Sequence, residues 1–275
     1  MATDTLHSVK SDIGRKRTHN EDCFAVDPAL GLYVICDGMG GGNAGEIASH
    51  MAIEAILTHV KGAAATPDLE LVGSVDPNLS ATTNQLASAI RAANEAVHKA
   101  SWQHAKYAGM GTTVVAIRIV KHYVSIAHVG DSRLYLVRNG TIQPLTSDHS
   151  WVAEQVAQGR MSEAEAERSP RRNIVTRALG VESTVEIDLA EMPLLSGDLL
   201  LLCSDGLTRG VRSKDILQIL ELDGDDLEAK TGRLVSMANE AGGDDNITVL
   251  LVAIQQGTSA RLWQRLRQRW LLKAS

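Results

Sequence analysis

The stretch VICDGMGGGNAGEIAS, residues 34–49, joins an apolar β-rich run to a helical run through a glycine-rich turn. Asp37 follows the apolar letters LYVIC and is itself followed by Gly38, Met39 and Gly40. Glycines let a backbone turn sharply and approach a bound ion closely, so a main-chain carbonyl can join the ion's ligands. The stretch therefore predicts a strand, a carboxylate at a tight turn, and a helix over about 45–60.

Other carboxylates stand beside apolar strands elsewhere in the chain. They are Glu21 and Asp22 before one strand, Asp131 after SIAHVG, Asp205 after DLLLLCS, and Asp244 and Asp245 before NITVLLVAI. One such Asp is an ordinary turn residue. The ends of central strands converge, however, and converging carboxylates repel one another unless a cation neutralises them. Oxygen ligands with few histidines nearby favour Mg²⁺ or Mn²⁺ over zinc.

A pair of ions bridged by Asp37 would suit phosphate-ester hydrolysis. Two metals about 3.5–4 Å apart activate a bridging water and clamp the phosphoryl oxygens, so no Ser or Cys nucleophile is needed. Arg17 stands four residues before Glu21. Alone it would be a solvated surface charge, but beside the acidic cluster its planar fork is suited to binding a phosphate.

The remaining pattern favours antiparallel sheets covered by helices, because strands recur through hairpins and regular βαβ alternation is absent. Asn139-Gly140 is a hairpin signal. A polar, helical insert is expected at 148–180. The β-rich runs are 6–13, 23–26, 32–36, 112–120, 123–129, 133–138, 185–189, 198–203 and 246–254, and the helical runs are 45–60, 82–104, 213–221 and 225–240. We expect one α+β domain.

Composition narrows the class of protein. The chain has 275 residues, 44% of them apolar and only 3% aromatic, so aliphatic side chains must fill the core. A net charge of −6 disfavours nonspecific nucleic-acid binding. Three scattered cysteines predict buried hydrophobes and not a disulfide framework. Neither a signal peptide nor an apolar run of about 18 residues is present, which favours a cytoplasmic protein.

Taken together, these residues resemble the metal-dependent protein phosphatases of the PP2C or PPM class, in their compact bacterial form. The resemblance covers about 6–255, and its segments occur in the family's order. The matching segments are SDIGRKRTHNEDCF (11–24), VICDGMGGGNAGEIAS (34–49), GMGTTVV (109–115), AHVGDSRLYLVRNG (127–140), LTSDHS (145–150), VTRALG (175–180), LLCSDGLTRGV (201–211) and GGDDNITVLLV (242–252).

The resemblance implies an αββα sandwich, two antiparallel sheets flanked by helix pairs, that hydrolyses phosphoserine and phosphothreonine in proteins. It implies a dinuclear Mn²⁺ or Mg²⁺ centre and a third, weaker metal site. Residues about 148–175 would form a flap that influences substrate choice. The implied roles are Asp37 as the bridge, Gly38 through its carbonyl, Asp205 and Asp245 completing the shell, Glu21 and Asp22 binding directly or through water, Asp131 in the third site, and Arg17 on the phosphate.

The chain departs from the family pattern at two places. Many eukaryotic members carry His after the Asp-Gly pair as a proposed general acid, whereas Met39 stands here, as in bacterial relatives. The group that protonates the leaving alcohol therefore stays unassigned. The Asp pair at 244–245 is doubled, and Asp245, which directly precedes Asn246, is the predicted ligand. Asp244 is expected to face solvent or to contact a ligand.

Residues 258–275 lie beyond the last matching segment. They carry five basic residues and no acid, so the tail is +5 and the rest of the chain −6 − 5 = −11. Leu and Trp side chains at helical spacing make the tail amphipathic. It either packs on the acidic body or remains partly disordered, or else it makes a weak contact with a membrane surface or a partner. The phosphatase domain itself is expected over 1–257.

Two other classes of function fit the sequence less well than metal-dependent hydrolysis does. A non-catalytic phosphoprotein-binding module on this fold would need an incomplete metal set, yet Asp37, Asp205 and Asp245 are all present. An aspartyl-phosphate mechanism wants a second Asp two residues after the first, and Met39 occupies that position. We therefore expect a monomeric phosphatase whose substrates are those of a serine/threonine kinase, or the kinase itself.

Overall fold

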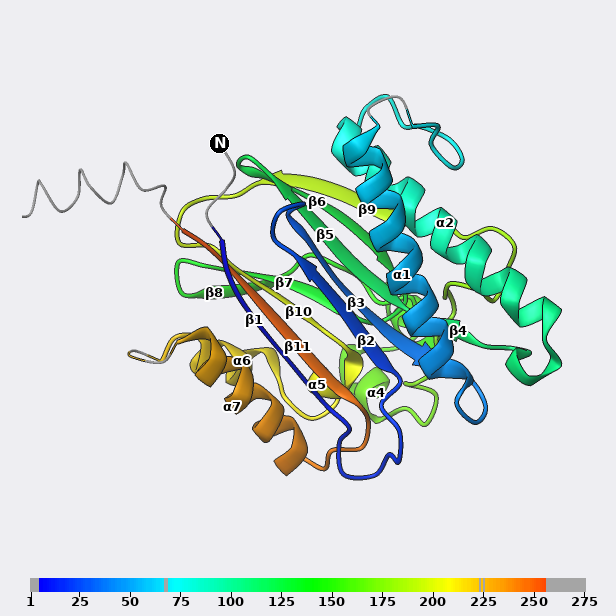
Figure 1. Cartoon of the computed structure of the whole chain (residues 1–275). Helices are drawn as coiled ribbons and strands as arrows, with labels where there is room; N and C mark the ends of the chain where they lie inside the picture. Colours follow the sequence, from blue (N-terminus) through cyan, green and yellow to red (C-terminus); the bar gives the residue numbers. More distant parts are fainter. Residues whose placement is uncertain (1–4, 67–68, 223, 225, 256–275) are drawn as a thin grey trace, which may run out of the picture.

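The computed structural model describes residues 5–66, 69–222, 224 and 226–255. One sheet contains five strands, and all its neighbouring pairs are antiparallel. Strands from both ends of the described range lie side by side in it (Figure 1). In spatial order the strands are β1 (Thr5–Asp12), β11 (Ile247–Ile254), β10 (Leu199–Cys203), β7 (Arg133–Arg138) and β8 (Thr141–Pro144).

The second sheet is also antiparallel and contains six strands. Its order is β2 (Asp22–Asp27), β3 (Leu32–Met39), β5 (Val114–Val120), β6 (Tyr123–Val129) and β9 (Asp188–Pro193), and the short β4 (Gly111–Thr112) pairs with β3. The turn predicted at Asn139-Gly140 joins β7 to β8 with φ of 51° and 71°, which these two residue types tolerate.

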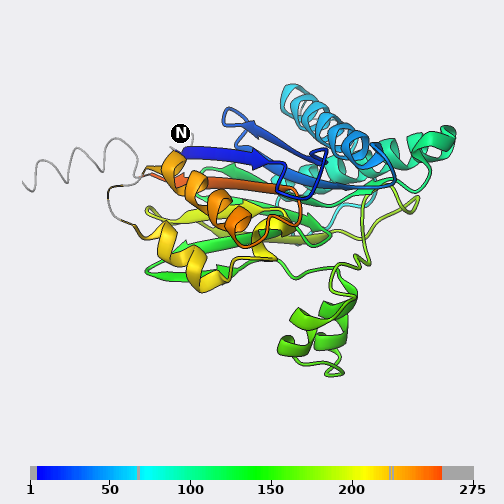
Figure 2. The ribbon, with the colours of Figure 1, turned by 90° about the horizontal axis from the view of Figure 1, so that it is seen from below.

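Helices cover the outer face of each sheet, and the two sheets pack against one another (Figures 1 and 2). Helices α1 (Ala44–Ala65) and α2 (Ala81–Gln103) cover the second sheet, and α6 (Ser213–Leu220) and α7 (Leu227–Glu240) cover the first. The layer between the sheets is buried and, apart from Tyr33, aliphatic in its core, with Ile35, Val115, Leu200 and Leu250 among its members. The predicted αββα sandwich is confirmed.

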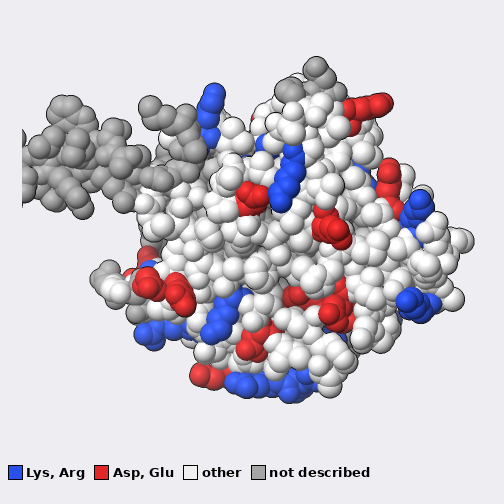
Figure 3. Space-filling view, viewed as in Figure 1, with Lys and Arg blue, Asp and Glu red and all other residues white. Residues whose placement is uncertain are grey.

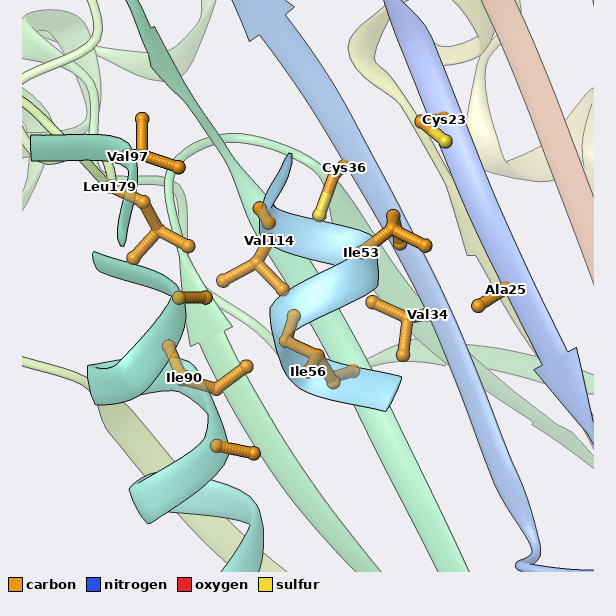
Figure 4. Close-up of a cluster of buried hydrophobic side chains, with 14 of the residues drawn as sticks. Cys23, Ala25, Val34, Cys36, Ile53, Ile56, Ile90, Val97, Val114 and Leu179 are labelled. Carbon is orange, nitrogen blue, oxygen red and sulfur yellow. The ribbon is translucent and has the colours of Figure 1, made fainter. Parts of the chain in front are cut away.

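Small residues let α1 and α2 pack closely on the second sheet. Ala48 and Ala52 on α1, and Ala89 on α2, have no exposed surface, and Ile56 and Ile90 fill the space between helices and strands (Figure 4). The N-terminus of α2 is capped by Ser80, whose hydroxyl accepts from the backbone N–H of Thr83. The three cysteines are buried and unpaired, as the sequence predicted.

Several predicted boundaries are wrong. The strand expected at 32–36 continues to Met39, because Gly38 and Met39 pair with β4. The strand expected at 112–120 is split between β4 and β5, where Thr112 also pairs with Leu179. The strand expected at 185–189 is β9, shifted to Asp188–Pro193. Its residues are mostly exposed, so hydrophobicity does not mark it.

Three short elements escape the sequence pattern, namely η1 (Ala105–Tyr107), β8 and α5 (Asp205–Thr208). Each has four residues or fewer, which is too short to show a period. Helix α5 matters for function, because it begins at one of the predicted metal ligands.

The predicted flap contains two short helices, α3 (Trp151–Ala157) and α4 (Glu163–Arg168), and it protrudes from the sandwich (Figure 2). Its base is closed by an antiparallel bridge between Ser150 and Val175. A capping box between Ser162 and Glu165 begins α4. The flap thus has local structure of its own and joins the body at one base.

The surface carries acidic and basic residues intermixed on the face seen in Figure 3. Among the described residues, none of the helices is both long and apolar enough to span a membrane. The amphipathic helix predicted for 258–275 lies outside the described residues.

Candidate active site

The strand ends that carry the predicted acids lie at one end of the sandwich (Figure 1), and the charges of Asp22, Asp205, Asp131 and Asp245 all act on Asp37. Asp22 and Asp37 are direct cross-strand partners in β2 and β3. Asp205 follows β10, and Asp245 precedes β11, the strand that pairs with β10. Facing strands of both sheets therefore deliver acids to a shared centre.

Two glycines make this approach sterically allowed. A Cβ on Gly38 would lie 2.0 Å from the carbonyl oxygen of Gly45, at the start of α1. A Cβ on Gly206 would likewise lie 2.0 Å from the carbonyl oxygen of Asn246. Because Gly206 follows Asp205 and Asn246 follows Asp245, this second contact sets those two acids side by side. A side chain at Gly38 would push β3 away from the start of α1, and one at Gly206 would push the segment after β10 away from the residue that precedes β11.

The backbone of Asp37 is fixed by the two threonines that join β4 to β5. Its N–H donates to Thr113 Oγ1 over 3.0 Å, and its carbonyl accepts from the Thr113 N–H at 2.8 Å and from Thr112 Oγ1 at 2.9 Å. The main chain is therefore anchored without use of the carboxylate. The side chain remains available to a ligand.

Burial and mutual repulsion raise the pKa values of these acids. Burial raises the pKa of Asp37 well above its usual range, and the charges of Asp22 and Asp205 add to the effect. The pKa of Asp22 rises to about 7, mainly by burial, although hydroxyl hydrogen bonds oppose the rise. Burial and the charge of Asp131 likewise raise the pKa of Asp205 to about 7. The pKa of Glu21 is raised too, again chiefly by burial.

Several carboxylate oxygens in this centre are buried without a hydrogen-bond partner. They are Glu21 Oε1, Asp22 Oδ1 and Asp205 Oδ1. Buried polar atoms are normally paired, and unpaired ones are costly. The other oxygen of Asp22 accepts from Ser204 and Thr248, each at 2.7 Å, so one oxygen is held while the other is free. Acids that repel one another and present unpartnered oxygens fit a site for hard divalent cations.

Asp131 stands beside this centre, at the turn that follows β6. Burial and the charge of Asp148 raise its pKa to about 6, although the charge of Arg209 opposes the rise. It adds to the repulsion at both Asp37 and Asp205. This position is consistent with the extra metal site that the resemblance implies.

The doubled aspartates differ sharply in environment. The Asp245 side chain is 10% exposed, whereas that of Asp244 is 48% exposed. Asp244 forms an ion pair with Lys16 at 2.5 Å. Asp245 instead contacts two arginines, Arg17 at 2.8 Å and Arg209 at 2.5 Å. The structure thus directs Asp245 inward and Asp244 to solvent.

Arg209 was not singled out from the sequence. It stands one helical turn after Asp205, and its guanidinium bonds to the carboxylates of both Asp205 and Asp245. The i, i+4 spacing from an acid was a signal that could have found it.

A second polar cluster lies at the base of the flap and was also not predicted. His128, His149 and Asp188 present potential ligand atoms within 4.8 Å of one another, the only such trio in the described part of the chain. The N–H of Gly130 donates to His149 Nδ1 at 3.0 Å, so the hydrogen of this ring is on Nε2, which faces Asp188 at 3.2 Å. Arg177 lies 3.0 Å from the same Nε2 and bonds to Asp188 at 2.8 Å. The N–H at Nε2 of His149 and the positive charge of Arg177 both disfavour the binding of a cation at this cluster.

An αββα sandwich with buried, mutually repelling carboxylates at one end of its sheets defines a metal-dependent phosphatase. Residues 13–251 match the family model described as Protein phosphatase 2C. The chain belongs to that family, and it is a metal-dependent protein phosphatase.

Relatives and solved structures agree with this assignment. The serine/threonine phosphatase stp of Listeria welshimeri is 39% identical over 257 residues, covering 91% of this chain and 98% of that protein. The structure of the serine/threonine phosphatase Stp1 from Staphylococcus aureus has a TM-score of 0.82 at 32% identity, covering 93% of this chain and 97% of that one. The catalytic domain of the phosphatase PstP in complex with two manganese ions has a TM-score of 0.77 at 32% identity, with 92% and 99% covered.

Proposed function

We propose that this chain removes phosphate from phosphoserine and phosphothreonine in proteins, with Asp37, Gly38, Asp205 and Asp245 holding two Mn²⁺ or Mg²⁺ ions. The observation that carries the proposal is the set of buried carboxylates whose charges raise one another's pKa values while their oxygens lack partners. Two similar proteins, a serine/threonine phosphatase and a phosphatase catalytic domain in complex with two manganese ions, support the substrate class and the metal.

When bound, the ions activate a water molecule for attack on the phosphorus and offset the charge of the phosphate. The residues of the chain would position the ions, the water molecule and the phosphate. Asp37, whose main chain is fixed by Thr112 and Thr113, would supply a carboxylate to both ions. Asp22 extends its free oxygen, and Glu21 acts directly or through water. Asp131, together with Asp205, would hold a third and weaker ion.

Arg17 receives the phosphate in this proposal. Its side chain is 45% exposed and reaches the rim of the centre, where its Nη2 contacts Asp245. A guanidinium fork beside a metal centre binds the phosphoryl oxygens that do not contact the ions. Arg17→Lys keeps the charge but loses the fork, so KM should rise more than kcat falls.

The decisive experiment measures hydrolysis of p-nitrophenyl phosphate and of a phosphothreonine peptide with and without Mn²⁺. We expect turnover that needs the metal and is abolished by Asp37→Asn and by Asp205→Asn. Phosphate release on the peptide should follow the same pattern. Activity that survives complete chelation would exclude the proposal.

The flap, about 148–175, governs substrate choice in this proposal. It protrudes from the sandwich at one base (Figure 2), and α4 is largely exposed whereas α3 is partly buried and includes the buried Val152. The preferred substrates would be the targets of a serine/threonine kinase, or that kinase itself. Comparison of the phosphoproteome with active enzyme and with Asp37→Asn enzyme would identify them.

The phosphatase domain and the C-terminal tail have separate roles in this proposal. We assign 1–257 to the phosphatase domain of a cytoplasmic monomer, and 258–275 to a basic tail that makes a weak contact with a membrane surface or a partner. Deletion of 258–275 should leave p-nitrophenyl phosphate turnover unchanged and weaken binding to anionic liposomes at low salt. Absence of liposome binding by the full chain would exclude the membrane contact.

A further inference from the structure

Arg209 lies inside the carboxylate centre, not at its rim. It follows α5, and its N–H bonds back to the carbonyl of Asp205 at 2.9 Å, so the helical path returns the side chain over that acid. The side chain is 21% exposed, less than half the exposure of Arg17. Its guanidinium joins Asp205 to Asp245, acids that belong to different strand ends. It is a bridging cation between two of the proposed ligands.

The oxygens of Asp245 are fully used in this arrangement. Oδ1 accepts from the N–H of Asn246 at 2.9 Å and also lies 2.8 Å from Arg17 Nη2. Oδ2 accepts from Arg17 at 2.8 Å and from Arg209 at 2.5 Å. Asp205 differs, because its Oδ1 is buried without a partner while Oδ2 bonds to Arg209. A metal could therefore reach Asp205 directly, but it must take the place of a hydrogen bond at Asp245.

The charge of Arg209 acts on the whole centre. It lowers the pKa of Asp205 and of Asp131, against the burial that raises both. The acids in turn raise the pKa of Arg209, with Asp205 and Asp245 contributing most, although burial opposes them. A guanidinium in this position offsets part of the repulsion among the acids. It also repels any incoming divalent cation.

We infer that Arg209 is an internal counter-cation that competes with the metal ion for Asp205 and Asp245 and so sets the metal affinity. The inference rests on the proposed function, because it takes these two acids as metal ligands. In the metal-free chain Arg209 stabilises the centre. Metal loading displaces it from Asp245, so the enzyme fills at a higher metal concentration than the carboxylates alone would require.

The test is direct Mn²⁺ binding without substrate, followed by the electron paramagnetic resonance signal of free Mn²⁺. Arg209→Gln removes the competing charge, so its Kd for Mn²⁺ should fall by about tenfold, the value of one charge-assisted hydrogen bond. The same variant, free of metal, should melt at a lower temperature than wild type, because its acids lose their counter-cation. With saturating Mn²⁺ that deficit should disappear.

Two further variants make the result specific. Arg212→Gln removes the same charge three residues away, where the side chain is 73% exposed and pairs with Asp215, so its Kd should equal that of wild type. Arg209→Lys keeps the charge but cannot bridge two carboxylates, so its Kd should fall by less than that of Arg209→Gln. If Arg209→Gln fails to fold, the Kd of Arg209→Lys for Mn²⁺ tests the inference instead. A wild-type or weaker affinity in the Arg209 variants would overturn the inference.

Asp205→Asn separates this inference from the proposed function. Loss of a ligand should raise the Kd for Mn²⁺. If it does not, the proposed ligand set fails. If it does, while the Arg209 variants bind Mn²⁺ as wild type does, only the role of Arg209 fails.

Discussion

Two polar clusters lie close together in this molecule, and they differ in how their charges are compensated. The carboxylate centre at the strand ends contains acids that raise one another's pKa values and oxygens without partners. In the cluster at the flap base, by contrast, His149 bonds to Gly130 and faces Asp188, which Arg177 also holds. The two are joined through Gly130, which neighbours Asp131.

This difference distinguishes the carboxylate centre, a candidate binding site, from the flap-base cluster, which has a structural role. In the flap-base cluster the charges of Arg177 and Asp188 balance, and only His128 lacks partners for its ring nitrogens. Burial lowers the pKa of His128 to about 4, so this ring stays neutral near pH 7. The carboxylate centre instead retains unbalanced negative charge, which the fold can tolerate only with protons, arginines or metal ions. Unbalanced charge and unpaired oxygens therefore identify the candidate metal site better than the proximity of potential ligand atoms does.

The largest effect is expected when two neighbouring acids that differ in burial, Asp245 and Asp244, are each replaced by Asn. Asp245→Asn should reduce Mn²⁺-dependent turnover about 10³-fold, the scale of several kcal/mol of lost charge stabilisation. Asp244→Asn is the matched control, because its side chain faces solvent and pairs only with Lys16 among the described contacts. It should keep activity within about twofold. Equal losses in the two variants would contradict the inward and outward assignment.

A second prediction concerns pH. The pKa values of Asp22 and Asp205 in the folded chain lie at about 7, above the ordinary 3.8. Their stabilising contribution is therefore present below the ordinary value and is lost as pH rises through about 7. The metal-free chain should lose at least about 1 kcal/mol of unfolding free energy between pH 6 and pH 8. Thermal unfolding with chelator checks this, and saturating Mn²⁺ should remove the loss.

The flap-base cluster should respond to mutation through stability and not through metal. His149→Ala leaves the buried N–H of Gly130 unpaired, which should cost about 1–3 kcal/mol of unfolding free energy. Denaturant unfolding gives this value, and Mn²⁺ binding should stay close to that of wild type. A large loss of Mn²⁺ affinity in this variant would show that the two clusters are not separate in function.

The smallest effect is expected at Asp188. Its side chain is 49% exposed, so Asp188→Asn should cost less than about 1 kcal/mol of unfolding free energy. Glu186 still pairs with Arg177 in that variant, at 3.1 Å. If unfolding shows a cost as large as that of His149→Ala, Asp188 and not Gly130 is the main support of the imidazole.

The sequence pattern allowed antiparallel sheets covered by helices to be predicted, because the strands are apolar and separated by clear turns, and the family resemblance implied the sandwich. The acids of the centre were also predictable as a group, since each stands at the end of an apolar strand. The structure brings them to one end, while their roles as ligands remain proposals. Strand β9 was misplaced because an exposed edge strand carries no strong apolar pattern.

What escaped prediction depends on contacts between distant segments. Arg209 gains its position only when β10 and β11 pair and set Asp245 beside it. Asp188 meets His128 through the register of β6 and β9, and His149 through the closure of the flap base. Such pairings follow from register and packing, which a single sequence does not specify at the level of one residue.

The pairing of β1 with β11 along its whole length has a consequence for the synthesis of this enzyme. Glu21 and Asp22 leave the ribosome early, whereas Asp245 leaves it late. The first strand must wait for a partner from the far end of the chain, and such non-local pairing makes folding slow. An unfinished chain therefore cannot assemble the centre. Premature termination before β11 should therefore yield inert protein and no partly active phosphatase.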